Sequence, residues 1–253
     1  MPCAEGVGVG ERNASLTPVG EGLKAFTLAE VLITLGIIGI VAAMTMPVLM
    51  QKYTNHLTET RLKKFYSIIN QAVLMSKNTN GDYESWDYWI DESVDDDGKN
   101  INKSDEIDLA FQKYIAPYMK IAMTKEVVDG DGQKRYLYFL ADGSAFASGD
   151  YSQNREFIFY PHNAERCIKL KTAESLGRCA FLFEFYPISK APAWAYLYKK
   201  GVEPVLVAWH GDVNKLYKGT IFSCKDGSGA YCTAIIVYNG WKVPDNYPRK
   251  ISY

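Results

Sequence analysis

The chain has 253 residues, 47% of them hydrophobic, which is enough for one sizeable globular domain and a further element. Its formal net charge is −1, so the composition gives no reason to expect nucleic acid or another strongly anionic surface as a partner. Aromatic residues make up 13% of the chain, with tyrosine the commonest at 18 residues. This composition is typical of β-rich domains.

The first segment, residues 1–25, is glycine-rich and polar and has no periodic apolar face. Its charged residues are Glu5, Glu11, Arg12, Glu21 and Lys24. The basic residues do not outnumber the acidic ones, so the positive-inside rule alone does not place this segment on the cytoplasmic side of a membrane. Translation from Val19 or Leu23 would leave a short leader that ends in Lys-Ala.

The next segment, residues 31–50, carries no charged side chain. A helix of about 20 residues spans about 30 Å, the hydrocarbon thickness of a bilayer. The run is too long for an ordinary core helix, and the apolar region of a secretory signal peptide has only about 7–15 residues. We therefore predict a membrane-spanning helix. Small residues within it offer faces for close helix–helix packing: Gly36, Gly39, Ala42 and Ala43.

Glu30 stands at the start of this apolar run. A carboxylate that faces lipid costs about 2.5–3.5 kcal/mol or more. In one interpretation Glu30 lies near the membrane interface and favours the positive end of the helix dipole. In the other it pairs with a cation inside the membrane or inside an assembly.

The run Lys24-Ala25-Phe26-Thr27-Leu28-Ala29-Glu30, followed by the apolar segment, resembles the prepilin peptidase site of type IV pilins and type II secretion pseudopilins. The resemblance implies cleavage between Ala25 and Phe26 and N-methylation of Phe26. It also implies that Glu30 pairs with the N-terminal amine of a neighbouring subunit, and that Pro47 is the helix-kinking proline of the family. Ala25 departs from the pattern, because Gly usually precedes the cut.

The family resemblance implies a structural subunit, a pseudopilin or minor pilin, that assembles into a type IV pilus or a type II secretion filament. Its partners would be the prepilin peptidase, other pilin or pseudopilin subunits, an inner-membrane assembly platform and membrane lipid. It would be a single-pass protein of the bacterial inner membrane with an extracytoplasmic C-terminal domain, and the filament would be periplasmic or extracellular. No nucleic acid is predicted as a partner.

A different class of function stays open, a signal-anchored extracytoplasmic binding module, for example for glycans. We expect no enzyme activity, since no histidine lies in a nucleophile-elbow, zincin or P-loop context. The histidines are His56, His162 and His210. No cofactor is expected, with calcium the one possibility.

Beyond Pro47 the pattern becomes amphipathic. Apolar residues recur at helical spacing at Leu62, Phe65, Ile69 and Val73. We predict one long helix with a membrane half, residues 26–50, and an amphipathic half, residues 51–80, followed by a globular domain over residues 81–253. The fold class is α+β, with the long N-terminal helix packed on a C-terminal antiparallel β-rich domain.

Residues 82–104 combine acidic and aromatic side chains. Trp86, Tyr88 and Trp89 are candidates for stacking on a glycan, but such residues more often fill a core. The run from Asp95 to Gly98 suggests a calcium loop, yet the bidentate Glu of an EF-hand is absent, which favours a solvated turn.

The rest of the chain predicts strands joined mostly by short turns, and hence an antiparallel sheet packed on the helix. A short helix is expected over residues 107–121, broken at Pro117. The strand patterns lie at residues 135–140, 145–147, 157–160, 180–186, 204–209 and 234–238.

Four cysteines form two close pairs in the sequence, Cys167 with Cys179 and Cys224 with Cys232. They allow three disulfide pairings, of which the two local bonds are favoured. Each would add about 2.5–3 kcal/mol of stability by chain entropy. The rival, a zinc site, lacks paired C-x₂-C spacings.

Overall fold

The computed structural model describes residues 27–150, 152–189 and 201–253. The chain divides into two compact units, Met1–Met46 and Pro47–Tyr253. We call the second unit the domain. The helices are α1 (Leu28–Asn80), α2 (Ser104–Tyr114), α3 (Ala164–Cys167), α4 (Thr172–Ser175), α5 (Val213–Tyr217) and α6 (Cys232–Tyr238). The strands are β1 (Ile121–Val128), β2 (Lys134–Leu140), β3 (Ala145–Ser148), β4 (Glu156–Tyr160), β5 (Phe181–Glu184) and β6 (Glu203–Pro204).

Helix α1 begins in the first unit and continues through Pro47 into the domain. In the first unit its large apolar side chains are exposed. By length and composition α1 can cross a membrane, and it lies near the N-terminus, as a single-pass anchor does.

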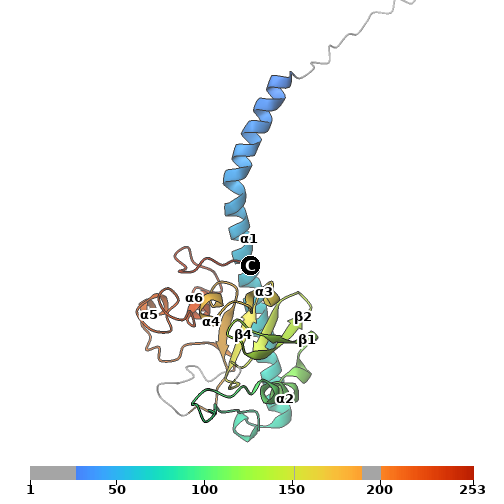
Figure 1. The fold of residues 1–253 in the computed structure, drawn as a ribbon, viewed down its shortest axis with the longest axis vertical. Helices are drawn as coiled ribbons and strands as arrows, with labels where there is room; N and C mark the ends of the chain where they lie inside the picture. Colours follow the sequence, from blue (N-terminus) through green and yellow to red (C-terminus); the bar gives the residue numbers. More distant parts are fainter. Residues whose placement is uncertain (1–26, 151, 190–200) are drawn as a thin grey trace, which may run out of the picture. The chain divides into compact units, whose positions relative to one another are not determined.

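The domain is built on one six-stranded antiparallel sheet in which the strands follow their order in the chain, from β1 to β6. Strands that are neighbours in the sheet are therefore consecutive in the chain. Figure 1 labels β1, β2 and β4 of this sheet. The predicted α+β fold is confirmed: a long N-terminal helix followed by an antiparallel sheet domain.

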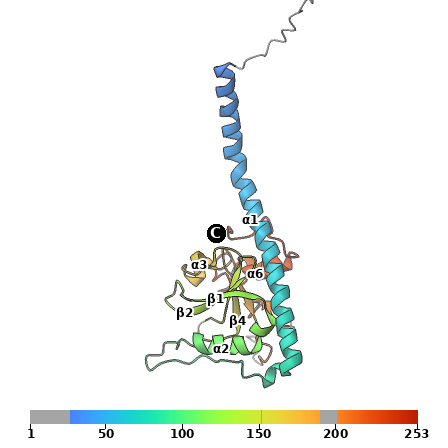
Figure 2. The ribbon, with the colours of Figure 1, turned by 90° about the vertical axis from the view of Figure 1, so that its right-hand side faces the viewer.

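One face of the sheet packs against the part of α1 that belongs to the domain (Figure 2). Phe65 of α1 is fully buried and stacks on Phe159 of β4, with ring centroids 4.5 Å apart. It also contacts Phe146 of β3 at 5.2 Å and Phe183 of β5 at 5.4 Å. Residues alternate between the two faces of a strand, so one phenylalanine from each strand reaches the same helix residue.

The opposite face of the sheet carries a second core, which contains Leu137, Ile158 and Leu182. It is closed by Val205 and Val207, which follow β6, and by the Cys167–Cys179 disulfide. The sheet is thus buried on both faces over its central strands, which explains why β4 and β5 read as nearly continuous apolar runs.

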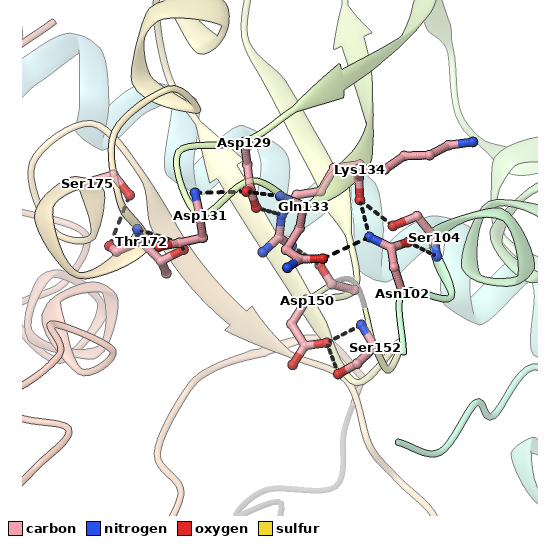
Figure 3. Close-up of polar contacts among 12 residues, drawn as sticks. Asn102, Ser104, Asp129, Asp131, Gln133, Lys134, Asp150, Ser152, Thr172 and Ser175 are labelled. Atoms are coloured by element: carbon pink, nitrogen blue, oxygen red, sulfur yellow. Dashed lines mark hydrogen bonds and ion pairs between the residues drawn. The ribbon is translucent and has the colours of Figure 1, made fainter. Parts of the chain in front are cut away.

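Side-chain hydrogen bonds shape the β1–β2 turn (Figure 3). Asp129 accepts hydrogen bonds from the backbone N–H groups of Asp131 at 2.9 Å and Gln133 at 2.8 Å. Asp131 in turn accepts from the backbone N–H of Thr172 at 3.0 Å and from its hydroxyl at 2.7 Å, which joins the turn to α4. A buried ion pair closes the turn, with Arg135 Nε 2.5 Å from Asp129 Oδ2.

The prediction of a strand over residues 234–238 is wrong, because this segment forms helix α6. Its residues from Cys232 to Ile236 are all buried, and they are divided between two cores, Ile236 in the core under α1 and Ile235 in a third cluster. A short helix that is buried all round has no polar face, so periodicity does not distinguish it from a buried strand.

Two further strand expectations are corrected at the edges of the sheet. Of the predicted strand over residues 204–209 only Pro204 pairs, in β6, and Ala208 has a left-handed φ of 56°, which ends an extended run. Strand β1 was not predicted, since its exposed edge carries charges and has no alternating pattern. The helix expected over residues 107–121 is α2, which ends at Tyr114 before a 3₁₀ turn at Ala116–Tyr118.

Candidate functional site

The first turn of α1 is closed by reciprocal hydrogen bonds between Thr27 and Glu30. The backbone N–H and the hydroxyl of Thr27 both donate to Glu30 Oε2, each at 2.9 Å. The backbone N–H of Glu30 donates to Thr27 Oγ1 at 3.2 Å. This is a capping box, in which Thr27 is the N-cap residue and Glu30 the third helical residue. Sequence analysis missed it, although Thr-x-x-Glu directly before an apolar run is its signature.

The capping box leaves part of the Glu30 carboxylate available. Both bonds from Thr27 go to Oε2, and Oε1 makes no hydrogen bond within the described part of the chain. Glu30 is exposed and lies at the positive end of the helix dipole. Ala25 and Phe26, the predicted cleavage pair, lie outside the described residues. The carboxylate therefore has the geometry to accept one further cation.

Between residues 27 and 46, the part of the first unit that the structure describes, the large apolar side chains are exposed. A Cβ atom added at Gly36 or at Gly39 would meet nothing within 4 Å. A glycine inside a helix costs about 0.5–1 kcal/mol relative to alanine, and no described residue lies close enough to require either glycine for space. Small residues of this kind permit close approach of another helix in an apolar environment.

The family model that matches covers residues 48–251 and is described as a family of unknown function, DUF6613. The chain belongs to this family. No curated protein and no solved structure matches it. The DUF6613 match begins directly after Pro47, so it covers nearly all of the domain and leaves out residues 31–47 of the apolar run. Pro47 itself lies within α1 at the first residue of the domain.

The DUF6613 region contains both local disulfides. Cys167 bonds Cys179 with a Cα–Cα distance of 5.9 Å, and Cys224 bonds Cys232 at 4.7 Å. All four cysteines are buried. The two local disulfides are the pairings that the sequence favoured. Disulfides of this kind form and persist in oxidising compartments.

The aromatic residues suggested for glycan stacking lie in the core. Trp86 and Tyr88 are 3% and 0% exposed, and only Trp89 is partly exposed. The indole N–H of Trp86 donates to the carbonyl of Gly81 at 3.0 Å. These rings cover the end of α1 rather than an external ligand.

The acidic turn near residue 95 is organised by its own backbone. Asp95 Oδ1 accepts from the backbone N–H of Asp97 at 3.1 Å and of Lys99 at 2.9 Å. Within the described ranges no group of three or more His, Cys, Asp or Glu side chains is placed to hold a metal ion. Asp212, close to His210 in sequence, caps α5 by accepting from the backbone N–H of Asn214 at 2.9 Å.

Proposed function

We propose that this chain is a pilin-like structural subunit, a pseudopilin or minor pilin, anchored by α1 and assembled into a type IV pilus or type II secretion filament. In this proposal prepilin peptidase cuts between Ala25 and Phe26, and Phe26 becomes the methylated N-terminus. The observation that carries the proposal is Glu30, an exposed carboxylate in the first turn of an apolar helix. One of its oxygens makes no hydrogen bond to any described residue.

The proposed chemistry of assembly is an ion pair in an apolar medium. A lone carboxylate at the depth of a bilayer costs about 2.5–3.5 kcal/mol or more, and an α-amine carries a comparable cost. When the Phe26 amine of one subunit meets Glu30 of its neighbour, each charge offsets the desolvation of the other. Gly36 and Gly39 support the same proposal, because their bare backbone suits close contact between the α1 helices of neighbouring subunits.

The experiment that tests the proposal compares two variants of the full chain in a host with a prepilin peptidase and an assembly system. Glu30→Val removes the carboxylate, whereas Thr27→Val removes only the hydroxyl half of the capping box. We expect Glu30→Val to remain in the membrane but to be absent from sheared filaments, while Thr27→Val assembles. If both variants lose assembly to the same extent, Glu30 acts as a helix cap and the pairing proposal fails.

Mass spectrometry of the mature N-terminus tests the processing step separately. The expected chain begins at N-methylated Phe26. A mature chain that retains Lys24 and Ala25 would make the protein an ordinary signal-anchored protein.

One observation favours the second candidate, a membrane-anchored glycan-binding module. A groove of about 490 Å³ on α1 is lined by Tyr66, Tyr83 and Trp241 together with Lys63 and Gln71. The Tyr66 and Trp241 rings lie 4.9 Å apart. Aromatic faces beside amide and ammonium donors suit a sugar ring. Binding of the full chain to a glycan array that Gln71→Ala and Trp241→Ala abolish, with unfolding midpoints unchanged, would support this candidate.

A further inference from the structure

The domain has a groove of about 470 Å³ between the start of its α1 portion and the C-terminal segment. Residues 47–55 of α1 form one wall and residues 243–251 form the other. Gln51 holds the walls together, since its side-chain amide donates to Asn55 Oδ1 at 2.8 Å and to the carbonyl of Ile251 at 3.1 Å. The groove is therefore a formed feature of the fold.

Three cations and one anion line this groove: Lys52, Arg249, Lys250 and Asp245. Within the described residues none of the three cations has a carboxylate oxygen within the 4.0 Å of an ion pair. Lys52 and Lys250 are exposed. The groove thus has an excess of positive charge that no described residue of the domain neutralises by an ion pair.

Among the described residues, the hydrogen-bond partners that fix Arg249 in the wall are all neutral. Its guanidinium donates to the backbone carbonyls of Cys224 at 2.5 Å, Leu176 at 2.7 Å and Gly227 at 2.8 Å. Burial, with the nearby charge of Arg178, lowers the pKa of Arg249. Since carbonyl oxygens carry no net charge, the positive field of Arg249 adds to that of the two lysines.

The sequence places this groove at the membrane surface. Lys52 comes two residues after Met50, the last residue of the uncharged run, and α1 is continuous through both. Tyr53, next to Lys52, is 63% exposed, and exposed tyrosines beside lysines mark the headgroup level. Val48 and Pro47, at the membrane end of the groove, present apolar surface where an acyl chain would begin.

We propose that this groove binds the phosphate headgroup of an anionic phospholipid in the bilayer that α1 crosses, with Lys52 and Lys250 contacting the phosphate. An anionic headgroup supplies the missing counter-charge. If α1 crosses the bilayer, lipid headgroups always lie beside the groove, so an anionic lipid is the counter-ion nearest to it. The inference rests on α1 as a membrane anchor and not on assembly into a filament. It therefore holds whether or not the pilin-like function does.

Native mass spectrometry of the detergent-solubilised full chain tests the inference by titration with phosphatidylglycerol and with phosphatidylcholine. Each lysine near a membrane surface contributes about a fivefold gain in affinity for anionic lipid. We expect phosphatidylglycerol to bind more tightly than phosphatidylcholine, and the double variant Lys52→Gln/Lys250→Gln to lose roughly 25-fold of this affinity. Both side chains are exposed, so the variant should keep its unfolding midpoint.

The matched control is Lys99→Gln/Lys225→Gln, which removes the same charge from exposed lysines that do not line the groove. It should bind phosphatidylglycerol as the unchanged chain does. Equal losses in both double variants would mean general attraction between charges and would overturn the proposal. So would equal affinity for the two lipids. Displacement of phosphatidylglycerol by inorganic phosphate would show a phosphate site instead, and tighter binding of an oligoglutamate peptide would show a site for a partner protein.

Discussion

Glu156 on β4 and Glu184 on β5 are directly opposite cross-strand partners, so their carboxyl groups lie on the same face of the sheet. Glu203 on β6 is the partner of Glu184 on its other side. Burial, then the charges of Asp150 and Glu184, raise the pKa of Glu156 to about 8. Burial and then Glu203 raise the pKa of Glu184 to about 7. Like charges in facing positions destabilise a sheet, so the sheet is most stable at these glutamates when their carboxyl groups are protonated.

The first prediction concerns pH. An unfolded glutamate has a pKa of about 4.3, so the folded state binds more protons than the unfolded state between about pH 4 and pH 8. The free energy of unfolding should therefore fall as pH rises through this window. Glu156→Gln should be more stable than the unchanged chain by on the order of 2 kcal/mol at pH 8, and nearly equal to it at pH 4. Urea unfolding of the detergent-solubilised chain, repeated from pH 4 to pH 8, measures the free energy of unfolding of the unchanged chain and of Glu156→Gln.

Other charged groups also act on this pair, including Asp150 and Glu203 among the acids and Arg135 and Arg155 among the bases. The control is Glu106→Gln, an exposed carboxyl group on α2. It should leave the slope of stability against pH unchanged. If Glu156→Gln leaves the slope unchanged too, the carboxyl pair is not strained in the folded protein.

The sequence predicted those parts of the fold whose patterns are local. The helical spacing of Leu62, Phe65 and Ile69 and the apolar runs of β2 to β5 each carry their own signal. The facing glutamates could not be predicted, because their meeting depends on strand register, which sequence spacing alone does not give. The Thr27–Glu30 box could have been predicted from its motif. Helix α6 was mistaken for a strand because both of its sides are buried.

The second prediction concerns the contact between α1 and the sheet. Phe65 is fully buried among three phenylalanines from three strands, so Phe65→Ala should leave a cavity and lower the free energy of unfolding by about 3–5 kcal/mol. Leu74→Ala, on the same helix but 57% exposed, should change it by less than about 0.5 kcal/mol. Urea unfolding curves give both values. Similar decreases in the free energy of unfolding for the two variants would mean that Phe65 does not stabilise the packing of α1 on the sheet.

The third prediction concerns the buried ion pair in the β1–β2 turn. Asp129→Asn should cost about 3–5 kcal/mol, because it leaves the charge of Arg135 without this partner and weakens the bonds that shape the turn. Asp131→Asn alters a less buried carboxylate that holds Thr172, and should cost about 1–2 kcal/mol. Amide exchange at Gln133 should rise more in Asp129→Asn than in Asp131→Asn. The reverse order would show that the link to α4 dominates the turn.

The last prediction concerns Gly177, which lies against the Cys224–Cys232 disulfide. It separates the cost of a strained backbone from the cost of steric overlap with the disulfide. Gly177 has a φ of 72°, and a Cβ atom there would lie 2.2 Å from Cys232 Sγ. Gly143 has a φ of 79°, but a Cβ atom there would meet nothing within 4 Å. Gly143→Ala should therefore cost only the left-handed strain, about 1–2 kcal/mol.

Gly177→Ala adds an overlap with a sulfur that the Cys224–Cys232 bond holds in place, so it should cost a further 1–3 kcal/mol, roughly. The difference between the two variants isolates the overlap. In the Cys224→Ser/Cys232→Ser background the extra cost should shrink only in part, because the freed serine hydroxyl can rotate away whereas the Cβ atom of residue 232, 2.6 Å from the added Cβ, stays in place. An equal cost for both glycine variants in the disulfide-bonded chain would mean that the backbone near Gly177 shifts without resistance and that this disulfide does not fix its surroundings.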